Sequence, residues 1–181
     1  MIEMIPTWRG GELLPMEKLK VHRRGLRHKA VSVFVLHGEE VLIQRRALGK
    51  YHTPGLWANT CCTHPRWGEA AGDCARRRLD EELGITGLAL CPRGQVEYRA
   101  DVGAGLVEHE QVEVFVAHVT RRIATRPDPE EVMAVDWVSR AALMTRIADD
   151  PGAYTPWLRI YLRQHAAQIF AEAGQARGLR D

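Results

Sequence analysis

One segment constrains the fold of this chain most: GEAAGDCARRRLDEELGI, residues 68–85, which predicts a single amphipathic helix with a defined end. Its apolar positions recur at intervals of four residues, at Ala71, Ala75, Leu79 and Leu83. Acidic residues lie early in the segment, and Gly84 follows the last apolar position, as at many helix C-termini. We therefore expect a helix over residues 69–83.

Strand patterns surround this segment on both sides. Five stretches have the composition or the alternation of strands: AVSVFVL (30–36), VLIQRRA (41–47), QVEYRADV (95–102), VEHEQVEVFVAHV (107–119) and EVMAVDWVS (131–139). The turn HGEE joins the first two, which predicts a hairpin. From Arg140 onward the chain is predicted to be helical, most strongly in PWLRIYLRQHAAQIFAEA (156–173), and the ending GQARGLRD to be frayed. Because no regular βαβ rhythm links these elements, they favour a mixed α+β domain.

Composition limits the class of protein. A chain of 181 residues with 45% hydrophobic and 27% charged residues fits one soluble domain. A net charge of +2 is too small to predict bulk binding of nucleic acid. The first residues do not resemble a signal peptide, and no apolar run approaches the roughly 20 residues of a membrane helix. We therefore expect a cytoplasmic protein with no membrane partner.

A cluster of cysteine and histidine lies directly ahead of the predicted helix, in LWANTCCTHPRWGEA (56–70). It suits a disulfide framework, a metal site or a catalytic thiol. The cysteines are irregularly spaced, at Cys61, Cys62, Cys74 and Cys91. Disulfides are rare in a reducing compartment, and no C-x-x-C pair indicates a zinc finger. The disulfide framework is therefore excluded, and the thiol and the metal site remain.

Carboxylates and histidines elsewhere in the chain add to this cluster. Strand alternation places Glu108 and Glu110 on the apolar face of 107–119, where they need a metal ion or a cation unless the strand end projects into solvent. His22, His28 and His64 together with these acids form a set of nitrogen and oxygen ligands that suits a divalent transition metal. Periodicity cannot show whether the five converge, and a single histidine is more often structural.

The charged end of the predicted helix also allows two interpretations. Arg76, Arg77 and Arg78 precede Asp80, Glu81 and Glu82, as on many solvated, salt-bridged surfaces. Alternatively, paired carboxylates at a helix end suit a hard divalent cation bound to phosphate.

The segment resembles the Nudix box, G-x5-E-x7-R-E-U-x-E-E-x-G-U, in which U is a bulky aliphatic residue. The matching positions are Glu69, Arg77, Leu79, Glu81, Glu82, Gly84 and Ile85. Thr63 replaces the first glycine, and Arg78 replaces the glutamate after the arginine. In Nudix hydrolases that glutamate is a metal ligand, so Arg78 removes a ligand and adds a group that binds phosphate. The resemblance therefore implies a Nudix fold whose hydrolytic metal cluster is disrupted by the loss of a ligand.

More specifically, RRALGKYHTPGLWANTCCTHP, EYRA, VEHE and TPWL resemble the signature segments of type 1 isopentenyl-diphosphate isomerases, a Nudix-fold family, from about Lys18 to Trp157. The segment between His22 and His28 is one residue shorter than the family form. The resemblance implies an α+β Nudix fold, with mixed β-sheets flanked by helices. It also implies a single Nudix domain over residues 1–181, with its core at about 18–165 between an N-terminal extension and a C-terminal helix and tail.

The resemblance also implies roles for individual residues. The catalytic pair is Cys62 with Glu110. The ligands of a Mn²⁺ or Zn²⁺ ion are His22, His28, His64, Glu108 and Glu110. Glu82 and the backbone carbonyl of Cys62 hold a Mg²⁺ ion that meets the substrate diphosphate. The residues that bind the substrate are Lys18, Arg46, Lys50, Arg78, Tyr98 and Trp157.

The implied reaction of isoprenoid biosynthesis converts isopentenyl diphosphate to dimethylallyl diphosphate by protonation and deprotonation. An acid and a base are then needed on opposite faces of the substrate, and the indole of Trp157 suits a carbocation. A Nudix diphosphate hydrolase is the alternative, which Arg78 disfavours. A second and weaker alternative is a protein that binds nucleic acid through the segment KLKVHRRGLRHK, because this segment lacks aromatic residues for stacking on bases. We expect a monomer whose partner is an isoprenoid diphosphate, not a nucleic acid.

Overall fold

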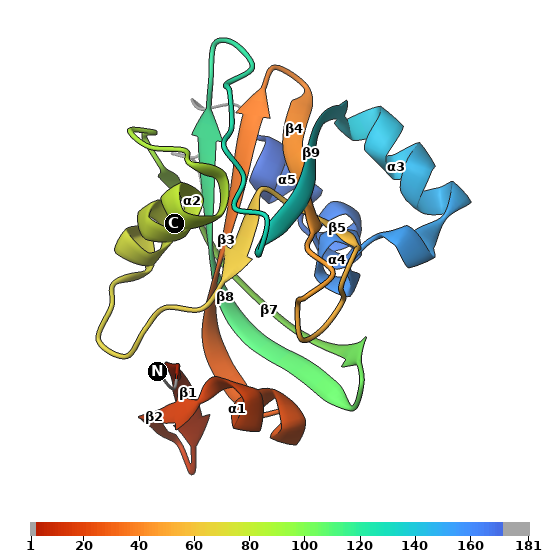
Figure 1. Cartoon of the computed structure of the whole chain (residues 1–181). Coiled ribbons are helices and arrows are strands. Elements are labelled where there is room, and N and C mark those ends of the chain that lie inside the picture. The colour runs from red at the N-terminus through yellow and green to blue at the C-terminus, as the bar shows by residue number, and fades with distance from the viewer. Residues whose placement is uncertain (1–2, 172–181) are drawn as a thin grey trace, which may run out of the picture.

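The computed structural model describes residues 3–171, and all its strands belong to one mixed sheet (Figure 1). The strands are β1 (Met4–Arg9), β2 (Glu12–Glu17), β3 (Arg27–His37), β4 (Glu40–Arg46), β5 (Trp57–Ala58), β6 (Cys61–Thr63), β7 (Cys91–Gly103), β8 (Leu106–His118) and β9 (Val132–Ser139). The helices are α1 (Lys18–Arg24), α2 (Ala71–Leu83), α3 (Arg140–Asp149), α4 (Pro156–Gln164) and α5 (Ala166–Phe170), with a 3₁₀ turn at Pro151–Ala153. The predicted α+β class is confirmed.

Strand β3 is the centre of the sheet. It pairs antiparallel with β1, β4 and β6, and parallel with β8 over ten residue pairs, from Arg27↔His109 to Leu36↔His118. Seven consecutive residues of β3, 30–36, are buried, as expected of a strand covered on both faces. The predicted hairpin is confirmed by the pairing of Leu36 with Val41, although β3 and β4 separate after that pair.

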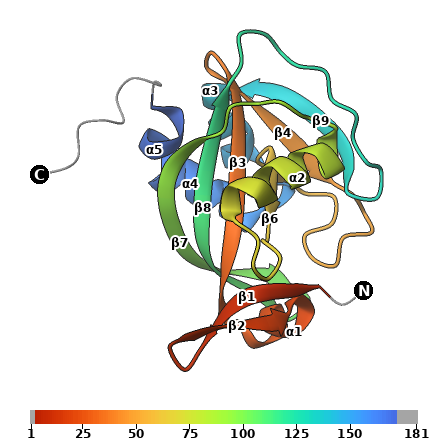
Figure 2. The ribbon, with the colours of Figure 1, turned by 90° about the vertical axis from the view of Figure 1, so that its left-hand side faces the viewer.

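Helices cover both faces of this sheet. Helix α2 packs on one face through Cys74, Ala75, Leu79 and Leu83, and α3, α4 and α5 contribute to the core on the other face (Figures 1 and 2). Since side chains alternate along a strand, β3 sends Val31, Val33 and Val35 toward α2 and Ala30 and Phe34 toward α4. Within residues 3–171, no helix is both long and apolar enough to cross a membrane.

The ends of α2 follow from its sequence. Gly84 adopts the left-handed conformation, with φ 63°, and its N–H donates to the carbonyl of Asp80 at 2.8 Å. A Cβ atom at this position would lie 3.0 Å from the Cβ of Arg126, so the site requires glycine for two reasons. The helix begins at Ala71, two residues later than predicted, because Glu69 lies in the preceding turn and binds the backbone N–H of Arg66.

Three regions differ from the sequence-based expectation, and one of them is the pair of short strands β5 and β6, which was not predicted. The N-terminal extension forms the β1–β2 hairpin and α1, none of which was predicted. The helix expected over 156–173 is interrupted at His165, where ψ is 13° and φ is −126°, so that α4 and α5 are separate. Residues 172–173 and the ending predicted to be frayed lie outside the described residues.

Candidate active site

Both carboxylates of the VEHE segment point into the protein. Glu108 and Glu110 are 2% and 1% exposed, which excludes the interpretation that the strand end projects into solvent. His109 between them points outward and lies 3.5 Å from Glu97. Tyr98, opposite Glu110 on β7, donates from its hydroxyl to Glu110 at 2.6 Å and to Glu108 at 3.2 Å. The alternation predicted from sequence therefore places both acids in the core beside one shared donor.

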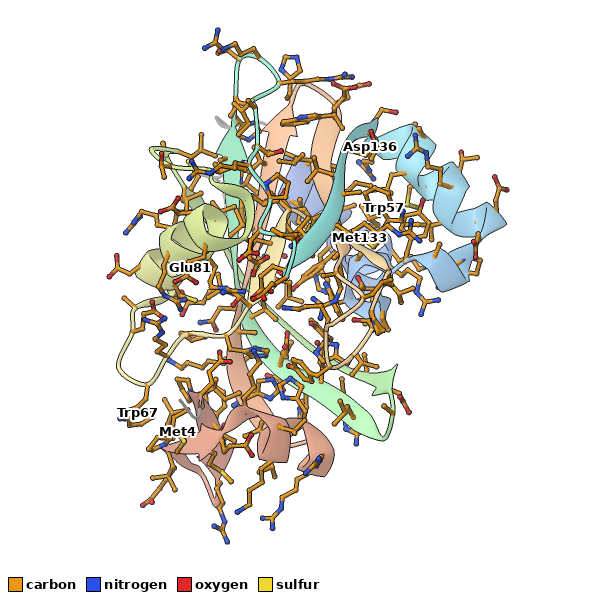
Figure 3. The ribbon with its side chains drawn as sticks, in the orientation of Figure 1. Met4, Trp57, Trp67, Glu81, Met133 and Asp136 are labelled. Atoms are coloured by element: carbon orange, nitrogen blue, oxygen red, sulfur yellow. The ribbon has the colours of Figure 1, made fainter. Side chains whose placement is uncertain are left out.

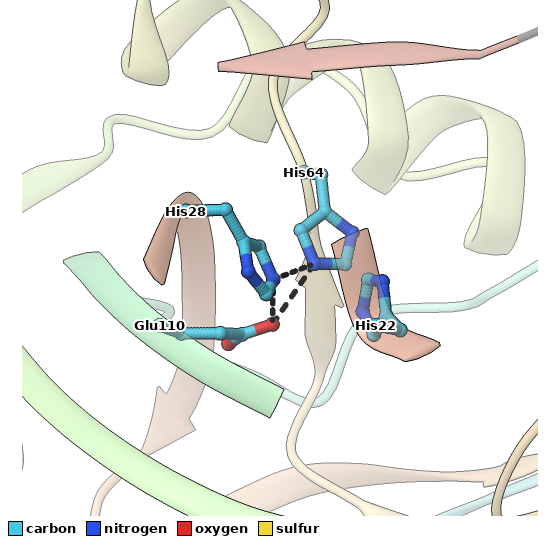
Figure 4. A group of neighbouring side chains, drawn as sticks. All are labelled: His22, His28, His64 and Glu110. Carbon is cyan, nitrogen blue, oxygen red and sulfur yellow. Dashed lines mark hydrogen bonds and ion pairs between the residues drawn. The ribbon is translucent and has the colours of Figure 1, made fainter. Parts of the chain in front are cut away.

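Three histidines converge on Glu110 from separate elements (Figure 4). His28 lies opposite Glu110 in the parallel register of β3 and β8, so their side chains share a face. His64 follows β6, and His22 comes from α1. The Glu110 Oε1 atom lies 2.9 Å from His64 Nε2 and 3.4 Å from His28 Nε2, and those two nitrogens lie 3.2 Å apart. One potential ligand atom from each of the four residues lies within 4.8 Å of the others.

The orientation of these imidazoles fits a divalent cation. The Nδ1–H groups of His22 and His28 donate to the carbonyls of Lys18 and Leu26 at 2.7 Å, which leaves each Nε2 directed inward. The Nε2 of His22 is buried without a hydrogen-bond partner. Backbone carbonyls orient metal-bound histidines in the same way. An inward-facing set of ring nitrogens beside a carboxylate, with one nitrogen unpartnered, is the donor set that a transition metal requires.

Burial and charge set the protonation of this group. Burial, followed by the neighbouring His28, lowers the pKa of His22 to about 4, and burial also lowers the pKa of His64. Burial alone would raise the pKa of Glu110, but the adjacent imidazoles of His28 and His64 outweigh it and hold that pKa below the ordinary value. At neutral pH, His22 and His64 are therefore neutral and Glu110 is ionised, as ligands of a cation must be.

Glu108 belongs to a second group, which includes a histidine that sequence analysis missed. His22, His52 and Glu108 also place ligand atoms within 4.8 Å of one another, and His52 Nε2 lies 3.5 Å from Glu108 Oε1. The expected five-ligand set is thus divided into four residues and a neighbouring group that shares His22. His52 lies in a loop beside Thr53, a β-branched residue with φ 45°, which indicates local strain. An isolated loop histidine carries no periodic signal that could have revealed it.

The Cys62 thiol faces the same side of the sheet as Glu110. Strand β6 pairs with β3 so that Cys62 lies opposite Ser32, whose hydroxyl donates to the thiol at 3.3 Å. Burial and the charge of Glu110 raise the pKa of Cys62, which keeps the thiol protonated. Cys61 points to the opposite face and packs in the core beneath α2. All four cysteines are free in this structure.

A narrow cavity of about 30 Å³ joins most of the predicted site residues. Its walls include Lys18, Arg46, Lys50, Cys62, His64, Arg78, Glu82, Glu108, Glu110 and Trp157. Three predicted site residues do not line this cavity: His22, His28 and Tyr98. Each of them contacts one of the histidines or carboxylates that do line it. Trp157 is 1% exposed, and the guanidinium of Arg46 lies 5.4 Å from the centroid of its indole ring. The structure therefore gathers all the predicted site residues in one region.

Comparison with known proteins decides the family. The model of the NUDIX domain matches residues 26–158. A Cereibacter sphaeroides protein named isopentenyl-diphosphate Delta-isomerase is 63% identical over 172 residues, which cover 95% of this chain and 97% of the relative. A Roseobacter denitrificans protein of the same name is 62% identical and covers 93% and 96%. The chain belongs to the isopentenyl-diphosphate Delta-isomerase family of Nudix proteins.

Two solved structures share the fold of this member of the isopentenyl-diphosphate isomerase family. A protein from Deinococcus radiodurans superposes with a TM-score of 0.70 at 16% identity, and the match covers 89% of this chain and 98% of that one. A MutT NUDIX hydrolase from Burkholderia pseudomallei superposes with a TM-score of 0.60 at 22% identity, covering 77% and 98%. At these identities the likeness concerns the fold alone, and it confirms the predicted Nudix fold.

The departure of this family member from the Nudix box has a visible consequence in α2. The Arg78 guanidinium lies 2.6 Å from Glu82, 2.9 Å from Glu81 and 3.1 Å from Glu131. The second carboxylate oxygen of Glu82 accepts a hydrogen bond from Gln44 at 2.9 Å. Arg78 therefore places a fixed cation among three carboxylates, at a position where the Nudix box has a further glutamate. Arg77, a matching position of the box, pairs with Glu69 at 2.6 Å and so ties the loop before the helix to α2.

Proposed function

We propose that this protein isomerises isopentenyl diphosphate to dimethylallyl diphosphate by protonation and deprotonation. One observation carries the proposal: the Cys62 thiol, the Glu110 carboxylate and four cationic side chains line the same narrow cavity. The names of relatives at 59–63% identity support the same reaction. The alternative, hydrolysis of a diphosphate, is disfavoured because Arg78 forms ion pairs with Glu81 and Glu82, two carboxylates of the Nudix box.

Cys62 and Glu110 are the catalytic pair of this proposal. The substrate alkene must gain a proton at one carbon and lose one from another, so the chemistry needs a donor and an acceptor on either side of it. Cys62 holds its proton at Sγ, whereas Glu110 is ionised and receives the hydrogen bond of the Tyr98 hydroxyl. The two groups supply one proton donor and one acceptor within a single cavity. Tyr98 orients the Glu110 carboxylate and can exchange a proton with it.

The metal ligands are a further part of the proposal. His22, His28, His64, Glu108 and Glu110 would hold a Mn²⁺ or Zn²⁺ ion, with His52 beside Glu108. Glu82 and the Cys62 carbonyl would hold a Mg²⁺ ion that accompanies the diphosphate. A divalent ion at Glu110 would supply fixed positive charge that tunes the basicity of this carboxylate. In this arrangement Glu110 has a single orientation, set by His28, His64 and Tyr98.

Cationic and aromatic side chains would bind the substrate. Lys18, Arg46, Lys50 and Arg78 come from four separate segments and face one cavity, which suits a diphosphate of several negative charges. Binding energy at the diphosphate would then orient the alkene between Cys62 and Glu110. The buried Trp157 excludes water, which would otherwise trap a carbocation as an alcohol, and its ring stabilises positive charge by about 2 kcal/mol or more when desolvated.

The cellular setting belongs to the same proposal. We propose that residues 18–165 are the core of one catalytic domain that acts in the cytoplasm as a monomer. Its partner is a small isoprenoid diphosphate, with no nucleic acid and no membrane involved.

Phosphorus NMR tests the reaction class in one experiment. Purified protein is incubated with isopentenyl diphosphate, Mg²⁺ and Mn²⁺, and both phosphorus and proton spectra are followed. The proposal predicts new methyl resonances of dimethylallyl diphosphate while the diphosphate signals keep their total intensity. Release of orthophosphate or pyrophosphate, with the alkene unchanged, would establish a hydrolase and contradict the proposal.

A further inference from the structure

A carboxylate that the proposed reaction does not use lies among the cations that would bind the diphosphate. Glu131, at the start of β9, forms ion pairs with Lys50, from the loop after β4, and with Arg78, from α2 at 3.1 Å. Its side chain is 25% exposed, whereas that of Glu82 is 5% exposed. Glu131 therefore bridges two of the four proposed diphosphate ligands from a position that solvent can reach.

The surroundings of Glu131 are strongly cationic. It lines a surface cavity of about 660 Å³ together with Lys18, Lys50, Arg66, Arg77 and Arg78, and Glu3 is the other carboxylate there. Met4 and Trp67, which lie near one another in Figure 3, also line this cavity, and the backbone N–H of Trp67 donates to the carbonyl of Met4 at 3.1 Å. On the other side, Lys50 and Glu131 also line a second surface cavity, of about 770 Å³. The Lys50–Glu131 pair therefore lines both surface cavities.

The inner cavity is much smaller than the two outer ones. Its volume is about 30 Å³, against about 660 Å³ and about 770 Å³ for the surface cavities. Lys50 lines this inner cavity as well as both outer ones, so its side chain forms part of the wall between them. A diphosphate that takes Lys50 and Arg78 as ligands must therefore replace the Glu131 carboxylate at both cations.

The backbone of Glu131 is fixed, so the side chain is the part that can move. Its carbonyl accepts the N–H of Ala47 at 2.9 Å, and its own N–H donates to Asp128 at 3.0 Å. Glu82, in contrast, is buried and held on both carboxylate oxygens by Arg78 and Gln44. Unlike Glu82, Glu131 can therefore leave Arg78 without disrupting the end of α2.

We infer that Glu131 is an internal counter-ion of the diphosphate site: it holds Lys50 and Arg78 in position before the substrate binds and yields both cations to the diphosphate. This inference rests on the proposed function for the identity of the diphosphate. The carboxylate and the diphosphate compete for the same two cations, so Glu131 lowers the affinity for the diphosphate and promotes its release. It is a positioning residue, since it does not touch the reacting carbons.

Binding of inorganic pyrophosphate tests this competition without any isomerisation. Isothermal titration calorimetry is carried out without divalent cations, so that the protein's own cations bind the probe, on the wild type, Glu131→Gln and Glu130→Gln. Glu130 is the matched control, because it is an exposed neighbour whose side chain makes no ion pair within residues 3–171. We expect Glu131→Gln to bind pyrophosphate about three- to tenfold more tightly, and Glu130→Gln to bind within about twofold of the wild type.

The dependence of pyrophosphate binding on ionic strength distinguishes an electrostatic role of Glu131 from a purely structural one. The gain in pyrophosphate affinity of Glu131→Gln over the wild type should shrink as the salt concentration is raised, because salt screens the electrostatic effect of the Glu131 charge. Unchanged or weaker binding in Glu131→Gln, with an unaltered melting temperature, would overturn the inference. The proposed function fails separately: if Glu131→Gln binds pyrophosphate more tightly but the wild type does not isomerise isopentenyl diphosphate, the counter-ion role stands and the isomerase does not.

Discussion

Removal of the metal should lower the thermal stability of the protein by a predictable amount. The His22, His28, His64 and Glu110 side chains come from four separate elements, so the unfolded chain cannot present them together. An ion that binds only the folded state stabilises it by about 2.7 kcal/mol when its concentration is 100 times the dissociation constant. For a chain of this length, each kcal/mol shifts the melting temperature by about 2–4 °C. Mn²⁺ should therefore raise the melting temperature by about 5–11 °C over protein treated with EDTA.

Far-ultraviolet circular dichroism measures this shift, after a Mn²⁺ titration has established the dissociation constant. His64→Gln should lose most of the shift, because His64 contacts both His28 and Glu110. His109→Gln is the matched control: its side chain lies between the two site acids in sequence but points outward, and it should keep the full shift. An equal shift in wild type and His64→Gln, or no shift in the wild type, would refute the assignment of these side chains as metal ligands.

Three further predictions follow from individual side chains. Cys62→Ala should reduce the turnover of isopentenyl diphosphate by about 10²–10⁴-fold, whereas Cys61→Ala, on the opposite face, should keep turnover and lose only stability; equal losses in both would contradict the assignment of the thiol. His52→Ala should weaken Mn²⁺ binding by about 10–100-fold, as measured by titration, and unchanged affinity would remove His52 from the site. The hydrogen bond from Arg77 lowers the pKa of Glu69 to about 2 from 4.5, so the stabilisation by Glu69, about 1–2 kcal/mol after allowance for solvent, is complete above about pH 4.5 and is lost as the pH falls toward 2. Urea unfolding of wild type and Glu69→Gln should accordingly differ at neutral pH and converge in acid, and a difference that persists in acid would exclude this origin.

The parts of the site that lie on regular elements could be predicted from the sequence. Alternation along β8 fixes the direction of Glu108 and Glu110, because successive side chains of a strand point to opposite faces. The 3.6-residue period and Gly84 similarly fix α2 and its end. These patterns involve residues close together in the chain, so they can be recognised in a single sequence.

The rest depends on contacts between distant segments. The parallel register of β3 and β8, which brings His28 opposite Glu110, leaves no mark in either strand alone. Helix α1 has seven residues, too few for a periodic pattern, and its N-terminus is capped by Glu17, which is not among the usual capping residues. That helix nevertheless places Lys18 and His22 one turn apart, at the cavity and at the histidine group respectively.

Incorporation of solvent hydrogen tests the central claim most directly. The purified protein is incubated with isopentenyl diphosphate, Mg²⁺ and Mn²⁺ in D₂O, and the products are followed by NMR. The account predicts dimethylallyl diphosphate that carries new deuterium on carbon, and no such product from Cys62→Ala. Substrate that remains unchanged, or a product without deuterium, would contradict protonation–deprotonation at Cys62 and Glu110.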